Sequence, residues 1–219
     1  QKDQTIAKVI DTKNNGYGSA CNLGAKNAKA KVLCFANPDT TITQGALEIL
    51  LRTIEKENVG VCGPCLKTKD GENEPWSMGK DRSPWETIQN NIGIKKNKKP
   101  WENTQTKTTD WVSGAFLVTK KELFEKINGF DENLFLYFED VDYCKRIRQR
   151  TNKIILHTPE AIVTHQGGTS MPDKQKKKKY YKQAQDYYFK KHYGQIQSTL
   201  FKVLRACTRL LRQKQTPLK

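Results

Sequence analysis

The sequence contains no long hydrophobic run. Nowhere in its 219 residues does it reach the roughly 18 to 20 uninterrupted apolar residues that a membrane-spanning helix needs. Residues 1–4 lead into no apolar stretch, so we do not expect this segment to be a secretory signal peptide. Hydrophobic residues at 36% and charged residues at 28% suit a globular domain with a core. The chain also lacks an initial Met, so we expect it to start inside a longer protein.

Acidic residues are nearly missing from the C-terminal fifth of the chain. Residues 174–219 contain fourteen Lys or Arg and one acid, Asp186, whereas residues 1–173 contain 25 basic and 22 acidic residues. The net charge of +16 therefore belongs mainly to the tail. This distribution predicts a catalytic body, residues 1–172, followed by a basic amphipathic helical tail, residues 173–219.

The second part of this tail predicts an amphipathic helix. Its apolar residues between Ile196 and Leu211 fall on one helical face, and most basic residues lie off that face. Such a helix could lie at the surface of an anionic membrane. It could equally pack against its own domain or a partner subunit, and both interpretations stay open.

The six cysteines form no dense disulfide framework, so we predict reduced and mostly buried thiols. Cys62 and Cys65 have the spacing of a thioredoxin-type redox pair. That chemistry requires the first thiol at a helix N-terminus, where its pKa is lowered. Residues 66–71 instead predict a strand running into a turn, which favours a structural role for the pair.

Strand and helix patterns alternate along the body. This alternation predicts an α/β fold with a mostly parallel sheet flanked by helices. The polar segment 70–108, which contains three Trp residues, predicts a long functional loop region. We expect strands at 5–10, 31–36, 59–66, 111–119, 153–156 and 161–164, and helices at 19–30, 46–54, 120–127 and 139–150.

Ligands of such sheets bind beyond the carboxyl ends of the strands, and the segment Asn37–Thr40 follows the apolar strand 31–36. A carboxylate at this position could coordinate a divalent cation that holds a diphosphate. Asp39 could also simply cap the next helix. The segment alone leaves both interpretations open.

Two further segments carry candidate chemistry. Glu139 and Asp140 follow an aromatic-rich run, where adjacent acids are costly unless they cap a helix or serve a site, for example as a general base. Asp142 could form an ordinary ion pair with Arg146, four residues later. His165 ends the last predicted strand, where a lone His is more often structural than a ligand.

Taken together, in this order and spacing, these segments resemble the inverting glycosyltransferases of family 2, particularly the rhamnosyltransferase-like branch. The resemblance covers nearly all of residues 5–170 and implies a GT-A fold, which is Rossmann-like. It rests on six segments in register and the strand that ends in His165, namely Asn14–Gly24, Asn37–Thr40, Val59–Pro64, Trp111–Ala115, Gly129–Glu132, Phe135–Asp142 and Pro159–His165.

The resemblance also implies roles for individual residues. It implies Mg²⁺ or Mn²⁺ held by Asp39, with His165 as a further metal or phosphate contact. It implies that Asp140 is the catalytic base, with Glu139 beside it. The implied donor-binding residues are Asn15, Gly16, Asn22, Gly24, Asn37 and Asp39, and the implied acceptor-binding residues are Trp111, Gly114 and Asp142.

The implied function is metal-dependent, inverting transfer of a sugar, with rhamnose favoured. The donor would be dTDP-rhamnose or a UDP-sugar, and the acceptor a hydroxyl of a cell-surface polysaccharide or a lipid-linked saccharide. We expect a cytoplasmic location, peripheral on the inner face of the plasma membrane, and no nucleic-acid partner.

The sequence departs from the family pattern at its N-terminus, and this departure leaves alternative functions open. The first strand and helix of the family, which hold the nucleotide base, have no match before residue 5, so we expect an N-terminally incomplete domain. A noncatalytic nucleotide-sugar-binding remnant is therefore one alternative. A nucleic-acid-binding protein that uses the basic, Tyr-rich tail is the other, although it leaves the acidic segments unexplained.

Overall fold

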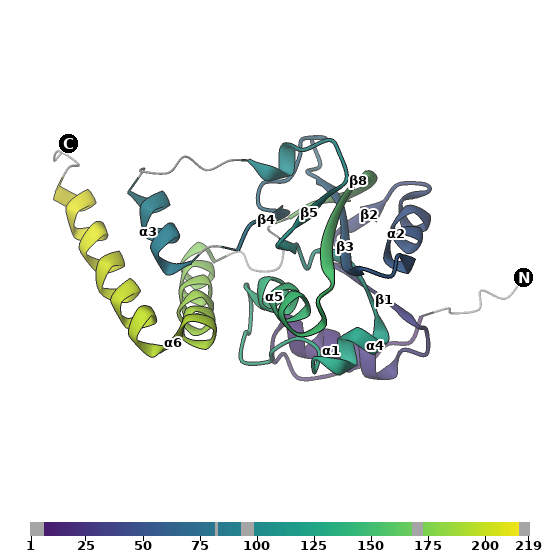
Figure 1. Ribbon diagram of the computed structural model, residues 1–219, viewed down its shortest axis with the longest axis horizontal. Helices are drawn as coiled ribbons and strands as arrows, with labels where there is room; N and C mark the ends of the chain where they lie inside the picture. The colour runs from purple at the N-terminus through teal and green to yellow at the C-terminus, as the bar shows by residue number, and fades with distance from the viewer. Residues whose placement is uncertain (1–6, 82, 93–98, 168–172, 215–219) are drawn as a thin grey trace, which may run out of the picture.

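The computed structural model describes residues 7–81, 83–92, 99–167 and 173–214. A mixed sheet forms the centre of the body, and a long helical segment follows it (Figure 1). In chain order the elements are α1 (Tyr17–Asn27), β1 (Val32–Ala36), β2 (Thr40–Ile42), α2 (Ala46–Glu55), β3 (Val59–Lys67), β4 (Met78–Gly79), α3 (Pro84–Asn91), the 3₁₀ helix η1 (Pro100–Glu102), β5 (Lys107–Thr109), β6 (Trp111–Val112), β7 (Phe116–Lys120), α4 (Lys121–Lys126), α5 (Glu139–Thr151), β8 (Ile154–His165) and α6 (Lys174–Lys214).

The main sheet has the order β1-β7-β3-β8-β2, and β5 also pairs with β8. β3 and β8 are parallel. β7 lies antiparallel between β1 and β3, so β1, β3 and β8 point the same way. The α/β prediction is confirmed. The expectation of a mostly parallel sheet is corrected to a mixed one, because β7, β2 and β5 run against the other three strands.

Helices cover both faces of this sheet (Figure 1). α2 packs on one face, where Leu50 and Ile54 meet Cys62 and Val118. The other face, with Val61 and Leu117, packs against side chains of α1, α4 and α5. β3 is consequently buried on both faces. Its near-continuous apolar sequence is typical of a central strand.

Two predicted strands differ from the structure. Residues 7–10 have no regular structure and Val9 is exposed, while residues 5 and 6 lie outside the described ranges. The predicted strand 111–119 is interrupted after Val112 by a turn, which separates β6 from β7. This turn frees the backbone of Gly114 from strand pairing and makes its N–H available to a side chain.

The basic tail folds as α6, which is kinked at Gly194, where φ is 85°. Its two halves pack against α3, with Tyr188, Phe189 and Phe201 around Ile88. The first half also reaches the body, because Lys191 and His192 both contact Asp142. Among the described helices, none combines the length and the apolar sequence needed to cross a bilayer.

Candidate active site

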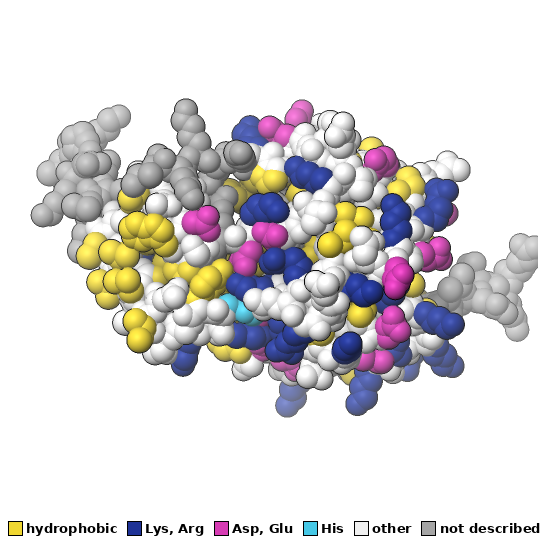
Figure 2. Space-filling model, viewed as in Figure 1, with side chains coloured by type: hydrophobic (Ala, Val, Ile, Leu, Met, Phe, Trp, Pro, Cys, Tyr) yellow, Lys and Arg dark blue, Asp and Glu magenta, His cyan; other side chains and the backbone are white. Residues whose placement is uncertain are grey.

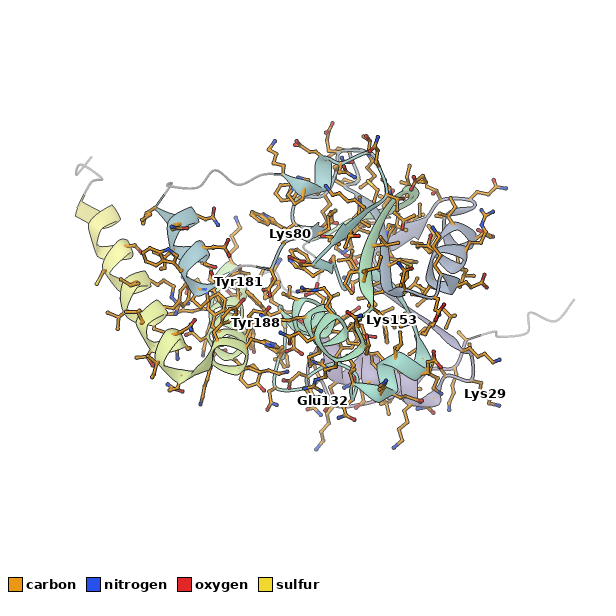
Figure 3. All side chains as sticks on the ribbon, viewed as in Figure 1. Lys29, Lys80, Glu132, Lys153, Tyr181 and Tyr188 are labelled. Carbon is orange, nitrogen blue, oxygen red and sulfur yellow. The ribbon has the colours of Figure 1, made fainter. Side chains whose placement is uncertain are left out.

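A large open cleft of about 1990 Å³ lies between the body and α6. The body contributes the turns after β1 and β6, the end of β8 and the segment before α5. α6 supplies the facing wall, and Tyr181 and Tyr188 project from it toward the body (Figure 3). The predicted residues Gly16, Asn37, Trp111, Gly114, Glu139, Asp140 and His165 all line this cleft.

A strained turn delivers the two adjacent acids into the cleft. Tyr137 and Phe138 both have positive φ angles, 72° and 67°. The left-handed region is costly for aromatic residues and persists only where surrounding contacts enforce it. Here Phe138 packs against Tyr181 and Tyr188 of α6. α5 begins immediately afterwards at Glu139.

Asp140 is held by backbone N–H groups. Gly114 N donates to Oδ2 at 2.8 Å, and Val141 N donates to Oδ1 at 2.8 Å. Burial raises the pKa of Asp140, and these backbone hydrogen bonds act in the opposite direction. A side chain on Gly114 would crowd both Tyr17 and Asp140. The strand break at Gly114 is therefore what lets the carboxylate sit at the cleft with a fixed orientation.

Glu139 has a different environment. It is buried, and its Oε2 has no hydrogen-bond partner among the described residues. Burial first, and then the charge of the neighbouring Asp140, raise its pKa to about 8. Glu139 is consequently protonated near pH 7. The negative charge of the pair then resides on Asp140, which has the N–H donors.

The second polar cluster lies where β2 and β8 pair. Thr40 is in register with His165, and this pairing brings Asp39 beside the imidazole. His165 Nε2 is 3.3 Å from Asp39 Oδ1, and Nδ1 is 2.9 Å from Glu74 Oε2. The pKa of His165 is raised chiefly by its hydrogen bond to Glu74, and also by Asp39.

Asp39 and His165 supply part of the ligand set that a divalent cation requires. Neighbouring ligands in an octahedral shell with bonds of about 2.0–2.1 Å lie about 3 Å apart, close to the separation of Asp39 Oδ1 and His165 Nε2. Glu74 meets the other ring nitrogen, which is the arrangement that orients metal-bound imidazoles. Within the described ranges, no three acidic, His or Cys side chains converge on one point. The protein alone therefore offers two ligands plus an orienting carboxylate.

Several predicted site residues lie elsewhere. The side-chain amide of Asn22 donates to the carbonyl oxygen of Phe130 and accepts from the Phe130 N–H. It also donates to the Glu132 carboxylate, so Asn22 holds a loop of the body in place. A Cβ added to Gly24 would meet no atom within 4 Å, and neither Gly24 nor Asn15 lines the cleft. The structure does not bring these three residues into the site.

Asp142 requires a correction as an acceptor-binding residue. Its side chain is fully buried and does not line the cleft. It binds Arg146 at 2.6 Å, Lys191 at 2.6 Å and His192 at 2.7 Å. The hydrogen bond from His192 and the charges of Arg146 and Lys191 hold its pKa below the usual range despite burial. Asp142 is a structural counter-ion that ties α5 to α6.

The sequence did not predict three residues that line the cleft, which are Glu74, Trp76 and, on α6, Tyr181. Glu74 lies in a polar stretch of the sequence. The chain turns back after β3, and this turn places Glu74 beside His165 at the end of β8. Trp76 lines the cleft with its ring 4.9 Å from that of Trp101, at a positive φ of 63°. The three Trp residues in segment 70–108 were the available signal. Tyr181 belongs to the basic, Tyr-rich tail, which the sequence does not predict to be part of the site.

Comparisons with known proteins identify relatives of this chain. The sequence profile described as "Glycosyl transferase family 2" matches residues 1–127. An N-acetylglucosaminyl-diphospho-decaprenol L-rhamnosyltransferase of Mycobacterium tuberculosis is 26% identical over 180 residues, which cover 69% of this chain and 56% of that protein. The rhamnosyltransferase WbbL of Escherichia coli is 28% identical over 142 residues, which cover 60% of this chain and 54% of that protein.

A solved structure shares the fold. The crystal structure of GalNAc-T7 with UDP, GalNAc and Mn²⁺ superimposes with a TM-score of 0.53 at 18% identity, covering 89% of this chain and 42% of that one. The GT-A prediction is thereby confirmed. The chain spans about half the length of the curated relatives that it matches.

Proposed function

Because this chain belongs to glycosyl transferase family 2, we propose that it transfers a sugar from a nucleotide-sugar donor to a hydroxyl group of an acceptor. The observation that carries the proposal is one cleft lined by both the oriented carboxylate Asp140 and by His165, which Asp39 contacts. The first group suits removal of a proton, and the second cluster suits a diphosphate with its cation.

In the proposed reaction, Asp140 accepts the proton of the acceptor hydroxyl. The oxygen forms a bond to the anomeric carbon while the bond from that carbon to the nucleoside diphosphate breaks. One displacement of this kind inverts the configuration. Gly114 and Val141 hold Asp140 through their N–H groups, and protonated Glu139 leaves the charge on Asp140.

Asp39 and His165 are the residues that would hold Mg²⁺ or Mn²⁺, with Glu74 fixing the imidazole. When bound, the cation neutralises charge on the departing diphosphate. His165 must be neutral to serve as a ligand. Since its pKa is raised, protons compete with the cation as the pH falls.

We assign dTDP-rhamnose as the first candidate donor and a UDP-sugar as the second. The names of the two rhamnosyltransferase relatives support rhamnose as the transferred sugar. A lipid-linked saccharide is the acceptor that the name of the mycobacterial relative supports. On the acceptor side, Trp111 and Gly114 line the cleft next to Asp140. Gly16 and Asn37 are the residues assigned to the donor side that reach it.

We place the protein at the cytoplasmic face of a membrane, and an exposed apolar stripe supports the contact with a membrane surface. Ile196, Leu200 and Val203 lie at helical spacing in the second half of α6 and are 85%, 57% and 54% exposed. Figure 2 shows hydrophobic side chains gathered over the α3 and α6 region. Exposed Lys202 lies in the same half of α6 as the stripe and suits anionic lipid.

The test is a panel of dTDP-, UDP- and GDP-sugars with Mn²⁺, in which donor binding and hydrolysis are measured. It should include this chain and a version extended at its N-terminus. The proposal expects metal-dependent binding and turnover of one donor class. Absence of nucleotide-sugar binding by both versions would refute it.

A further inference from the structure

α6 contacts the start of α5 along one side of that helix. Val141 and Asp142 stand four and three residues before Lys145, which places all three on the same face of α5. Val141 and the preceding Phe138 pack against the apolar cluster that α3 and α6 form. Asp142 binds two side chains of α6, and Lys145 Nζ donates to the Tyr193 hydroxyl at 3.0 Å. We call this apolar group the α3–α6 cluster, and it consists of Ile88, Tyr188, Phe189 and Phe201.

These contacts lie on both sides of Asp140 in the chain. Phe138 precedes Asp140 by two residues, Val141 follows it directly, and both pack against the α3–α6 cluster. Val141 also supplies one of the two N–H groups that hold the Asp140 carboxylate. A displacement of α6 would therefore loosen the chain on both sides of the proposed base.

Tyr188 connects the turn before Asp140 to the second turn of α5. Its ring lies 5.2 Å from that of Phe138, and its hydroxyl donates to Asp81 at 2.7 Å. Asp81 in turn binds Lys145 of α5 at 2.8 Å. Because Tyr188 is only 1% exposed, its influence on a reaction in the cleft runs through these contacts.

The turn before Asp140 requires such support. Tyr137 and Phe138 have φ angles of 72° and 67°, a conformation that is costly for aromatic residues. Tyr181 packs against both of their rings, at 5.7 Å and 5.3 Å, and lies on the same side of α6 as Tyr188 (Figure 3). Without these rings the turn could relax toward ordinary backbone angles, and this relaxation would move Asp140.

We propose that Tyr181 and Tyr188 are positioning residues for the base Asp140, so that α6 completes the active site. This inference rests on the proposed function and gives the basic tail a part in the chemical step. A displacement of about 1 Å in a reacting group can lower a rate about 100-fold. Donor binding should not depend on α6 in this way, because the pairing of β2 with β8 places Asp39 beside His165.

The test compares Tyr188→Leu with the matched control Phe201→Leu. Both variants remove a buried ring of the α3–α6 cluster, but the Phe201 ring packs on Phe189, 4.7 Å away. Tyr188→Leu should lower kcat at least about tenfold and leave KM for the donor within about twofold, whereas Phe201→Leu should lower kcat less than about threefold. Tyr188→Phe keeps the ring and should recover most of kcat. Equal losses of kcat in the two Leu variants, or a change confined to donor KM, would overturn the proposal.

A second variant covers the case in which Tyr188→Leu does not fold. Tyr181 is 48% exposed, so its substitution perturbs the core less. Tyr181→Leu should lower kcat at least about threefold with donor KM unchanged, and Tyr181→Phe should restore it. An unchanged kcat in Tyr181→Leu would remove this residue from the proposed role.

Amide hydrogen exchange separates this proposal from the proposed function, because it requires no turnover. The N–H groups of Gly114 and Val141 donate to Asp140, whereas Val118 lies in the centre of the main sheet. In Tyr188→Leu, exchange at Gly114 and Val141 should accelerate at least about tenfold more than exchange at Val118. This result would support the positioning role even if no sugar is transferred. Equal acceleration at all three amides would show a general loss of stability and refute it.

Discussion

Asp140 and Asp142 stand two residues apart on α5, yet they have opposite electrostatic environments. Asp142 is surrounded by Arg146, Lys191 and His192, and its pKa is lowered. Among the described residues, the groups that donate to Asp140 are backbone N–H groups. The glutamate beside it is protonated, and burial raises the pKa of Asp140. The difference shows that burial alone does not assign a role to an acid. A carboxylate that binds Arg146, Lys191 and His192 holds the structure together. A carboxylate held by backbone N–H groups remains available to take a proton.

The largest expected effect separates these two acids. Asp140→Asn should lower transfer by about 10²–10⁴-fold, the range of general base catalysis, while donor binding and the melting temperature stay near those of the wild type. The measurement is steady-state transfer alongside donor calorimetry. A variant with normal turnover would remove Asp140 from its proposed role.

Asp142→Asn should act mainly on stability. Removal of one partner from a buried charge cluster leaves uncompensated cations and costs about 3–5 kcal/mol. Because the pKa of Asp142 is lowered in the folded protein, its contribution is present at neutral pH and lost as the pH falls. Denaturant unfolding at pH 7 and pH 4 measures this. An unchanged unfolding free energy at pH 7 would contradict the structural role.

Glu74→Gln should weaken metal-dependent activity by about 10–100-fold, as loss of an orienting carboxylate does. The apparent Mn²⁺ affinity should fall for the same reason. In the wild type, Mn²⁺ affinity should also decrease as the pH drops, because His165 with its raised pKa becomes protonated. Titration of activity with Mn²⁺ at several pH values tests both statements. A Mn²⁺ affinity independent of both Glu74 and pH would exclude His165 as a ligand.

The smallest effect in the comparison concerns Glu139. Its raised pKa, about 8, means that the folded state loses stability as the pH rises from the ordinary carboxyl range toward 8. Glu139→Gln keeps the neutral form, so its melting temperature should exceed that of the wild type by at least about 3 °C at pH 8. At pH 5 the difference should be smaller. Equal differences at both pH values would show that Glu139 is not protonated in the fold.

The sequence predicted those features that depend on neighbouring residues along the chain. The apolar run 31–36 and the following Pro38 placed Asn37 at a strand end, and the acids after an aromatic run placed Glu139 at a helix start. Both placements are confirmed. The roles of Asp39 and Asp140 remain predictions.

Features set by distant contacts could not be predicted in the same way. The resemblance implied an acceptor role for Asp142, and its partners Lys191 and His192 lie some fifty residues later in the chain, where no local pattern reveals them. Glu74 reaches His165 because β3 pairs with β8 and the chain turns back after β3. The sequence left open whether the tail packs on its own domain or lies on a membrane. In α6, Phe201 is buried against the protein, whereas Leu200 is exposed.

The configuration of the product tests the central claim most directly. NMR of the glycoside formed from a nucleotide-sugar donor of known anomeric configuration, with Mn²⁺ present, would reveal the stereochemical course. A single displacement assisted by Asp140 predicts an inverted anomeric centre. A retained configuration would contradict the account, because it requires a mechanism other than one displacement by the acceptor hydroxyl.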